Sequence, residues 1–81
     1  MRKPLPIHTY TQINTNDIKF LIQNVSHDDL LIYVGATKPA DDADYDYILS
    51  YGQGISGSHL TGLCWGKPEG KTPISVSVTE G

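Results

Sequence analysis

The chain has 81 residues, which allows one domain near the lower size limit for a core that is stable unaided, and its single cysteine excludes an intramolecular disulfide. The formal net charge of -3, without a basic stripe, is evidence against nucleic-acid binding. No stretch approaches the roughly 20 apolar residues of a membrane span and no signal peptide is visible, so we expect a soluble protein made in a reducing cytoplasm, with no membrane partner.

The first nine residues are predicted to form an extended N-terminal arm. Pro4 and Pro6 have no backbone donor and disfavour a helix. Leu5 and Ile7 are apolar, which suits contact with another surface better than a free tail. We therefore expect residues 1–9, with Tyr10 beside them, to lie on a neighbouring subunit; the alternative is a disordered arm. Residues 10–81 then form a single β domain.

Two strands are predicted next, over residues 17–25 and 30–34. In the first, Ile18, Phe20 and Ile22 alternate with Lys19, Leu21 and Gln23, the period of a half-buried strand. The second, LLIYV, is nearly continuous in apolar residues, as in a central strand covered on both faces. Because only turn-forming residues separate them, we predict a β-hairpin.

The rest of the chain continues the pattern of short strands. Residues 35–44 are predicted to be an acidic loop, residues 45–50 a strand, residues 52–58 a loop or bulged edge, and residues 67–71 a turn. Strands are expected over residues 59–66 and 73–80, with Ile74, Val76 and Val78 facing inward. Counting a further candidate at residues 9–13, this predicts an all-β fold, a small antiparallel sandwich or barrel of about five to seven strands.

Two patterns resemble ligand sites but lack an essential part. Residues 52–57 match G-x-G-x-x-G, yet no helix follows to receive a phosphate. Asp42, Asp44 and Asp46 alternate as at the start of a calcium loop, but the glycine and glutamate of an EF-hand are absent. A calcium site of another kind, using these residues with Asp41, remains the alternative to a solvated loop. No cofactor is predicted.

Cysteine and histidine offer no clear catalytic or metal centre either. His8, His27 and His59 are far apart, so with Cys64 they lack the paired spacing of structural zinc ligands. Cys64 stands between Leu63 and Trp65 on a predicted strand, which is typical of a packing residue and not of an activated thiolate. We therefore do not expect an enzyme.

Tyrosine is the most frequent aromatic residue, with five copies against one Phe and one Trp. A tyrosine buries its ring and keeps a hydrated hydroxyl, which suits interfaces. Tyr45, Tyr47 and Tyr51 are therefore the preferred contact residues, although ordinary strand packing is the alternative for at least one of them. The predicted interface consists of Pro4, Leu5, Pro6, Ile7, Tyr10, Tyr45, Tyr47 and Tyr51.

Four segments together resemble a known family. They are IQNVS, DDLLIYVGATKPADD, GLCWGKPEG and ISVSVTEG, and the resemblance covers about residues 18–81. In order and layout they are similar to small β-sandwich structural proteins of tailed bacteriophages. The resemblance implies a virion location and a capsid decoration or cement protein. It also implies partnership with the major capsid protein or other virion proteins, and a homo-oligomer with a trimer favoured.

A second hypothesis is a virion module that binds carbohydrate or the host surface. It would use Tyr45, Tyr47, Tyr51 and Trp65 with the acidic loop. Deleting residues 1–9 is expected to separate the two, because only the cement role needs the arm. If Trp65 is buried in the core, replacing it by alanine should cost about 3 to 5 kcal/mol and unfold the domain.

Overall fold

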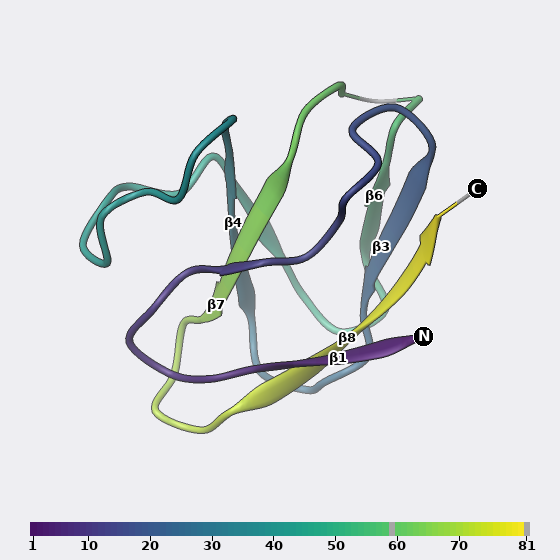
Figure 1. The fold of residues 1–81 in the computed structure, drawn as a ribbon. Helices are drawn as coiled ribbons and strands as arrows, with labels where there is room; N and C mark the ends of the chain where they lie inside the picture. The colour runs from purple at the N-terminus through teal and green to yellow at the C-terminus, as the bar shows by residue number, and fades with distance from the viewer. Residues whose placement is uncertain (59, 81) are drawn as a thin grey trace.

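The computed structural model describes residues 1–58 and 60–80 and confirms the all-β prediction. Within these ranges the chain forms eight strands in two antiparallel four-stranded sheets, packed as a small sandwich (Figure 1). No helix in the described part of the chain is long and apolar enough to cross a membrane. The strands are β1 (Arg2–Leu5), β2 (Thr11–Gln12), β3 (Phe20–Asn24), β4 (Leu30–Val34), β5 (Tyr47–Leu49), β6 (Gly54–Ser56), β7 (Cys64–Pro68) and β8 (Ile74–Glu80).

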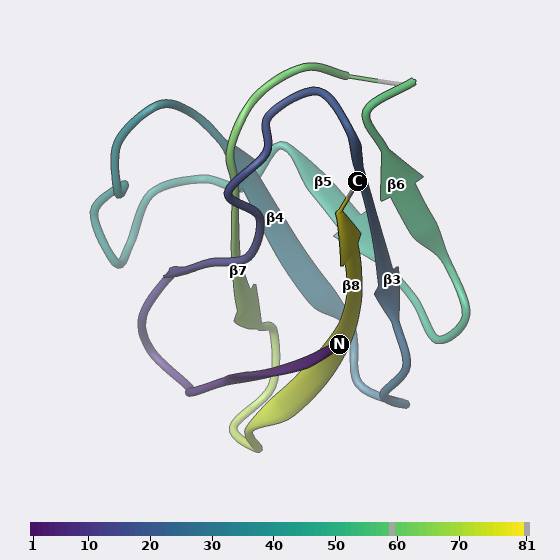
Figure 2. The same cartoon turned by 45° about the vertical axis from the view of Figure 1, so that its right-hand side comes forward.

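The strands are ordered as in a jelly roll. One sheet has the order β1-β8-β3-β6 and the other β2-β7-β4-β5. The two halves of the chain therefore pair strand by strand, β1 with β8, β2 with β7, β3 with β6 and β4 with β5. This order results when an antiparallel ribbon, folded back at the β4–β5 connection, wraps around a core. Figure 2 shows the two sheets that result.

The predicted hairpin of residues 17–25 and 30–34 is wrong, because β3 and β4 lie in opposite sheets. β3 pairs with β8 and β6, whereas β4 pairs with β7 and β5. The link between β3 and β4 is fixed by Asn24, which is fully buried. Its amide donates to Asp28 O at 2.9 Å and Leu49 O at 2.8 Å, and its oxygen accepts from Ser26 N–H at 2.9 Å. Alternation and turn residues predict two strands and a bend, but they do not specify which strands pair.

The N-terminal residues are extended, as predicted, but they belong to the domain's own sheet. Arg2–Leu5 forms β1 and pairs with β8, with Leu5 opposite Ile74. The Met1 amine donates to Val78 O at 3.0 Å, and Val78 N–H donates to Met1 O at 2.7 Å. β1 is an edge strand, where proline is tolerated because the strand has only one pairing partner. The separation into an arm of residues 1–9 and a domain of residues 10–81 is therefore corrected.

Short strands account for the difference between the predicted five to seven strands and the eight observed among residues 1–58 and 60–80. β1 lies inside the predicted arm of residues 1–9, and β6 lies inside residues 52–58, where the sequence predicts a loop or a bulged edge. β6 has three residues and is indeed at an edge of its sheet. Segments this short carry too few residues for a period of two to be recognised.

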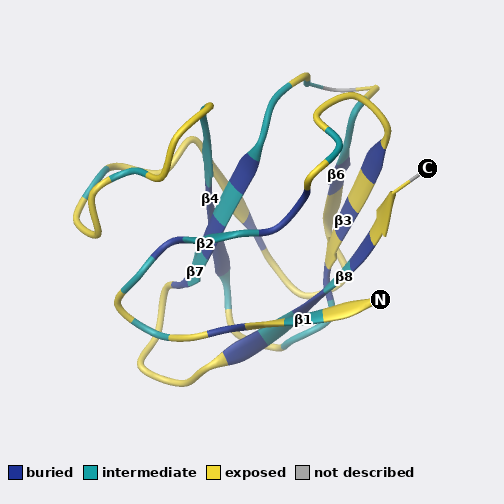
Figure 3. Cartoon of the chain, viewed as in Figure 1, coloured by how far each residue is buried: buried dark blue, intermediate teal, exposed yellow. Residues whose placement is uncertain are grey.

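The core lies between the sheets and follows the alternation of side chains along each strand. Ile74, Val76 and Val78 of β8 point inward, as predicted. Along β7 the inward side chain is Cys64, whereas Trp65 is half-buried on the outer face. Figure 3 shows buried and exposed residues alternating along β3 in the same way. The core cluster consists of Leu5, Ile13, Phe20, Ile22, Leu30, Ile32, Leu49, Ile55, Cys64, Ile74, Val76 and Val78.

Glu80, at the end of β8, fixes the link between β2 and β3. Its carboxylate accepts from Asn16 N–H at 2.8 Å and from both the backbone N–H and the hydroxyl of Thr15. These hydrogen bonds, the one from Asn16 foremost, lower the pKa of Glu80 against a smaller opposing effect of burial. The charged form is therefore stabilised in the folded chain.

We expect Glu80→Gln to destabilise the fold in a pH-dependent way. Because the folded pKa is lowered, the contribution is present above the unfolded pKa of about 4.5 and is lost as the pH falls through the folded value. The loss at neutral pH should stay below about 1 kcal/mol, since the site is exposed and screened. Urea unfolding at several pH values measures it, with Glu69→Gln in the β7–β8 turn as the charge-matched control. A difference between the two variants that persists at about pH 3 contradicts the assignment.

Candidate functional site

Exposed apolar side chains concentrate on residues 45–51, around the edge strand β5. Tyr45, Tyr47, Ile48 and Tyr51 are 49, 44, 43 and 59% exposed, whereas Leu49 faces the core. They make up four of the seven large hydrophobic side chains that are exposed among the described residues. Sequence reasoning identified the three tyrosines and missed Ile48, although a period of two with Leu49 inward would have placed Ile48 outward.

The N-terminal contact residues are divided by their burial. Leu5 is completely buried in the core, so its prediction as an interface residue is wrong. Pro4 and Pro6 are exposed, and Ile7 is half-buried. The apolar character of Leu5 reflects pairing with β8 in the same chain and not contact with a neighbouring subunit.

Tyr10 is only 1% exposed, so its prediction as an interface residue is also wrong. Its ring contacts Tyr33 with centroids 5.9 Å apart, and the Lys67 ammonium lies 4.7 Å from its centroid. The Tyr10 hydroxyl donates to Ala43 O at 2.8 Å. Burial, with a smaller effect from nearby Asp44, raises the pKa of this phenol. Tyr10 therefore belongs to a second, small core on the outer face of the β2-β7-β4-β5 sheet.

The acidic loop extends over residues 35–46 in the structure, two residues beyond the predicted 35–44. It covers this second core and is tied to the sheet at several points. The Asp46 carboxylate accepts from Val34 N–H at 2.7 Å, and Asp41 accepts from the Thr9 hydroxyl at 3.0 Å. Lys67 donates to Asp41 O, and the Trp65 indole donates to Gly35 O at 2.9 Å. The premise that Trp65 is buried in the main core is therefore wrong, because its ring lies on the outer face beside the acidic loop.

The aspartates of the loop do not converge on a common point. Asp41 and Asp46 bind different partners, Thr9 and Val34. Among residues 1–58 and 60–80, no three His, Cys, Asp or Glu side chains are grouped in a way that could hold a metal ion. The zinc ligand candidate His59 lies outside the described residues. The structure thus gives no support to the calcium alternative for Asp41, Asp42, Asp44 and Asp46.

Tyr51 lies against the loop between β3 and β4. Its ring stacks on His27 with centroids 4.4 Å apart and an interplanar angle of 20°. Both residues are exposed, and the connection is supported by backbone hydrogen bonds from Gly52 to Asn24 and from Asn24 to Gln53. The stack holds Tyr51 at the end of the β5 segment, where the residue remains 59% exposed.

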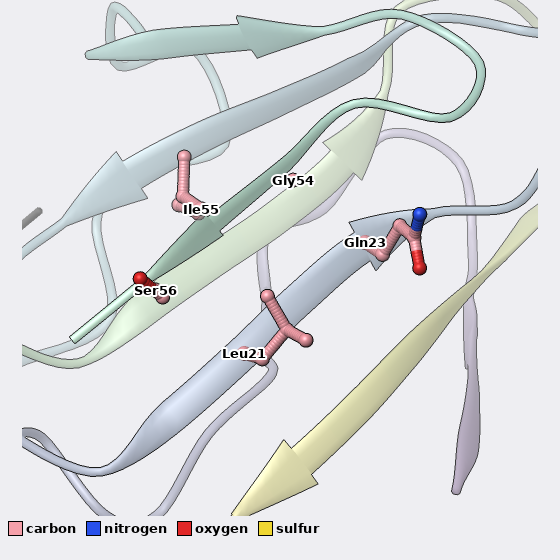
Figure 4. Close-up of a pocket in the computed structure, with 5 residues that line it drawn as sticks. All are labelled: Leu21, Gln23, Gly54, Ile55 and Ser56. Carbon is pink, nitrogen blue, oxygen red and sulfur yellow. The ribbon is translucent and has the colours of Figure 1, made fainter. Parts of the chain in front are cut away.

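A shallow groove runs between β3 and the edge strand β6. It has a volume of about 260 Å³ and is lined by Leu21, Gln23, Gly54, Ile55 and Ser56 (Figure 4). Leu21 is 47% exposed, and Gly54 contributes no side chain to cover it. The groove carries no acid, base or thiol, so its lining suits an apolar contact and not chemistry. Leu21 was visible in the sequence as the outward member of an alternating strand.

A second groove, of about 240 Å³, carries charge, and one of its lining residues, Leu31, pairs with Ile48 of β5. It is lined by His8, Leu31, Lys67, Pro68, Glu69, Gly70 and Lys71. Lys67 is already engaged with Tyr10 and Asp41, so it is not a free cation for a ligand. Cys64 is in neither groove, and burial raises the pKa of its thiol to about 11. The thiol is therefore protonated at neutral pH, as expected of a packing residue.

No protein-family model, curated protein or solved structure matches the chain.

Proposed function

We propose that the chain is a non-enzymatic structural subunit of a bacteriophage virion, a capsid decoration or cement protein that binds its neighbours through residues 45–51. The observation that carries this proposal is the concentration of exposed Tyr45, Tyr47, Ile48 and Tyr51 around one edge strand. Exposed apolar patches in small proteins mark interaction surfaces, and tyrosine is enriched in such interfaces. The resemblance of residues 18–81 to phage structural proteins is the reason for proposing the virion as the location.

The size of the domain supports an assembly role. A chain of 81 residues has a small core, and the fold uses main-chain pairing from Met1 onward to complete it. Binding to a folded lattice stabilises such a domain by mass action, because the lattice binds only the folded state. The major capsid protein and other virion proteins are the proposed partners.

The chemistry of the described surface favours binding over catalysis. The thiol is buried, and the β3–β6 groove has no titratable side chain. The jelly-roll order is compatible with the proposal, since it occurs in viral capsid proteins, but also in lectins and cupins, so it does not select one function. The exposed tyrosines carry the argument.

The proposal is tested in particles of the phage that encodes the chain. We expect mass spectrometry of purified virions to find the protein in many copies. A variant with Tyr45, Tyr47 and Tyr51 replaced by serine should be depleted from particles. Leu21→Ser, which removes an exposed apolar side chain elsewhere, should be retained. Absence of the wild-type protein from particles contradicts the proposal, as does equal incorporation of both variants.

The second candidate, a carbohydrate- or host-surface-binding module, is favoured by the accessible ring of Tyr51 on its His27 stack. Two of its other predicted parts are less available, because Trp65 donates to Gly35 and the acidic loop is tied to the sheet. Deletion of residues 1–9 does not separate the two functions, since it removes β1 and the core residue Leu5. Glycan binding by the purified chain, lost in Tyr51→Ser and retained in Leu21→Ser, would favour this module.

A further inference from the structure

The four edge strands of the sandwich differ in how they are protected against pairing with another chain. β1 carries Arg2, Lys3 and Pro4, and β2 has only two residues. β6 begins with Gly54, and its one large apolar side chain, Ile55, is buried. Charge, proline and shortness are the usual means by which proteins block an edge.

β5 is as short as β6, but it lacks the other protections. Its residues Tyr47, Ile48 and Leu49 include no lysine, proline or glycine, and Tyr47 and Ile48 are exposed. It lies at the end of the β2-β7-β4-β5 sheet, beyond β4 (Figure 2). β5 is therefore the edge most suited to accept another strand.

β5 can pair with a second copy of itself in the antiparallel direction. The strand spans Tyr47–Leu49 with Ile48 at its centre, and the chain turns after it, where Gln53 N–H donates to Ser50 O at 3.0 Å. If two copies pair about a two-fold axis at Ile48, Tyr47 of one copy lies opposite Leu49 of the other, and the two Ile48 residues lie opposite each other. All these pairs are apolar, whereas like charges directly across two strands would destabilise the sheet.

This arrangement also separates the acidic loops. Each copy has a net charge of -3, and Asp41, Asp42, Asp44 and Asp46 all precede the centre of β5. Antiparallel pairing sends the two loops to opposite ends of the joined strands, so no carboxylate faces another across the junction. The register thus removes the main electrostatic obstacle to pairing of two identical acidic chains.

We infer that two copies of the chain associate through antiparallel pairing of their β5 strands about a two-fold axis at Ile48, forming one continuous sheet. The inference rests on the proposed assembly function and assigns a partner to the 45–51 segment. A two-fold junction closes on itself, so it produces a dimer and not the trimer that the family resemblance favours. Because β5 has three residues, the isolated dimer is weak, with a dissociation constant on the order of 10 to 100 μM. A lattice would strengthen it through multivalency.

Sedimentation velocity of the full chain up to about 1 mM tests the inference. The wild type should shift from a monomer of 8.9 kDa to twice that mass as concentration rises. Ile48→Lys places two lysines at the axis and should weaken the dimer about tenfold or more, and Ile48→Glu should do the same. An equimolar mixture of the two variants should recover it, since opposite charges then meet. Leu21→Lys, on β3, should dimerise like the wild type.

Cross-linking tests the register independently. Paired antiparallel strands bring opposite Cα atoms to about 4.5 to 5.5 Å, which is within the range of a disulfide. Ile48→Cys should therefore form a covalent dimer on mild oxidation, whereas Leu21→Cys should not. The native Cys64 is buried and does not interfere.

Several outcomes overturn the inference. They are a chain that stays monomeric to about 1 mM, a dimer unaffected by Ile48→Lys, or equal cross-linking of the two cysteine variants. A monomer that is nonetheless abundant in virions would refute the β5 dimer and leave the proposed function standing. A β5 dimer that is absent from virions would refute the proposed function and leave the β5 dimer standing.

Discussion

Replacing Asn24 by alanine is expected to lower the free energy of unfolding by about 2 to 4 kcal/mol, a large share of the stability of a domain this small. Asn24 is completely buried and uses its amide group to join the β3–β4 link to β5. Removing the side chain leaves Leu49 O without this donor and opens a cavity. Buried polar groups that lose a partner bear the full cost of desolvation, which exceeds the net value of an ordinary hydrogen bond.

Gln23→Ala provides the matched control for this prediction. Gln23 is the exposed neighbour of Asn24 and donates one hydrogen bond of 3.2 Å to Gly52 O. Its loss should change stability by no more than about 0.5 kcal/mol. Chemical denaturation, with tryptophan fluorescence as the probe, measures the free energy of unfolding of both variants. Equal denaturation midpoints for Asn24→Ala and Gln23→Ala would show that the buried Asn24 amide does not stabilise the β3–β4 link.

Asn14 has a corresponding role on the other side of the sandwich. It is completely buried, donates to Asn16 O and Gly62 O at 3.0 and 3.1 Å, and accepts from Cys64 N–H at 2.6 Å. Each asparagine thus satisfies backbone groups of an irregular segment that the sheet ladders do not reach. From the sequence alone, asparagine between predicted strands indicates only a turn.

Local features of the fold were predictable because they depend on neighbours in the sequence. The inward residues of β8 and the central position of β4 follow from alternation and from an apolar run. The pairing of strands was not predictable in the same way. In a jelly roll, β1 meets β8 and β3 meets β6, and neither partner is marked by a turn between them. The β3–β4 hairpin was predicted wrongly because the sequence between two strands does not show which strands pair.

The same distinction holds for the candidate site. Tyr45, Tyr47 and Tyr51 were predicted as contact residues from their type and position, and they are exposed. Tyr10 has the same chemistry but is buried, because the acidic loop folds back over it through hydrogen bonds to backbone carbonyls. An irregular loop leaves no periodic signal in the sequence. Exposure at a single tyrosine therefore depends on tertiary contacts that composition does not reveal.

The glycine pattern at residues 52–57 has a structural cause. Gly52 has a φ of 83°, in the left-handed region that glycine favours. A Cβ at Gly57 would lie 1.6 Å from Ile18 O and 2.6 Å from Ile18 C, both backbone atoms. Gly57 N–H also donates to Phe20 O at 3.0 Å. The glycines thus allow the end of β6 to approach the chain that enters β3, and the nucleotide-binding interpretation has no helix to support it.

Gly57→Ala is therefore expected to be among the most damaging substitutions in the chain. The methyl group meets backbone atoms, which cannot rotate away as a side chain would, so β6 must separate from the start of β3. We expect a loss of about 3 kcal/mol or more, as when overpacking displaces the main chain. Gly70→Ala is the control, because a Cβ there meets nothing within 4 Å. Thermal unfolding compares the two, and hydrogen exchange at residues 54–57 should rise first in Gly57→Ala. Similar melting temperatures for both variants would mean that the backbone before β3 moves away from the new methyl group without loss of stability. The close approach at Gly57 would then not be the reason why this position is a glycine.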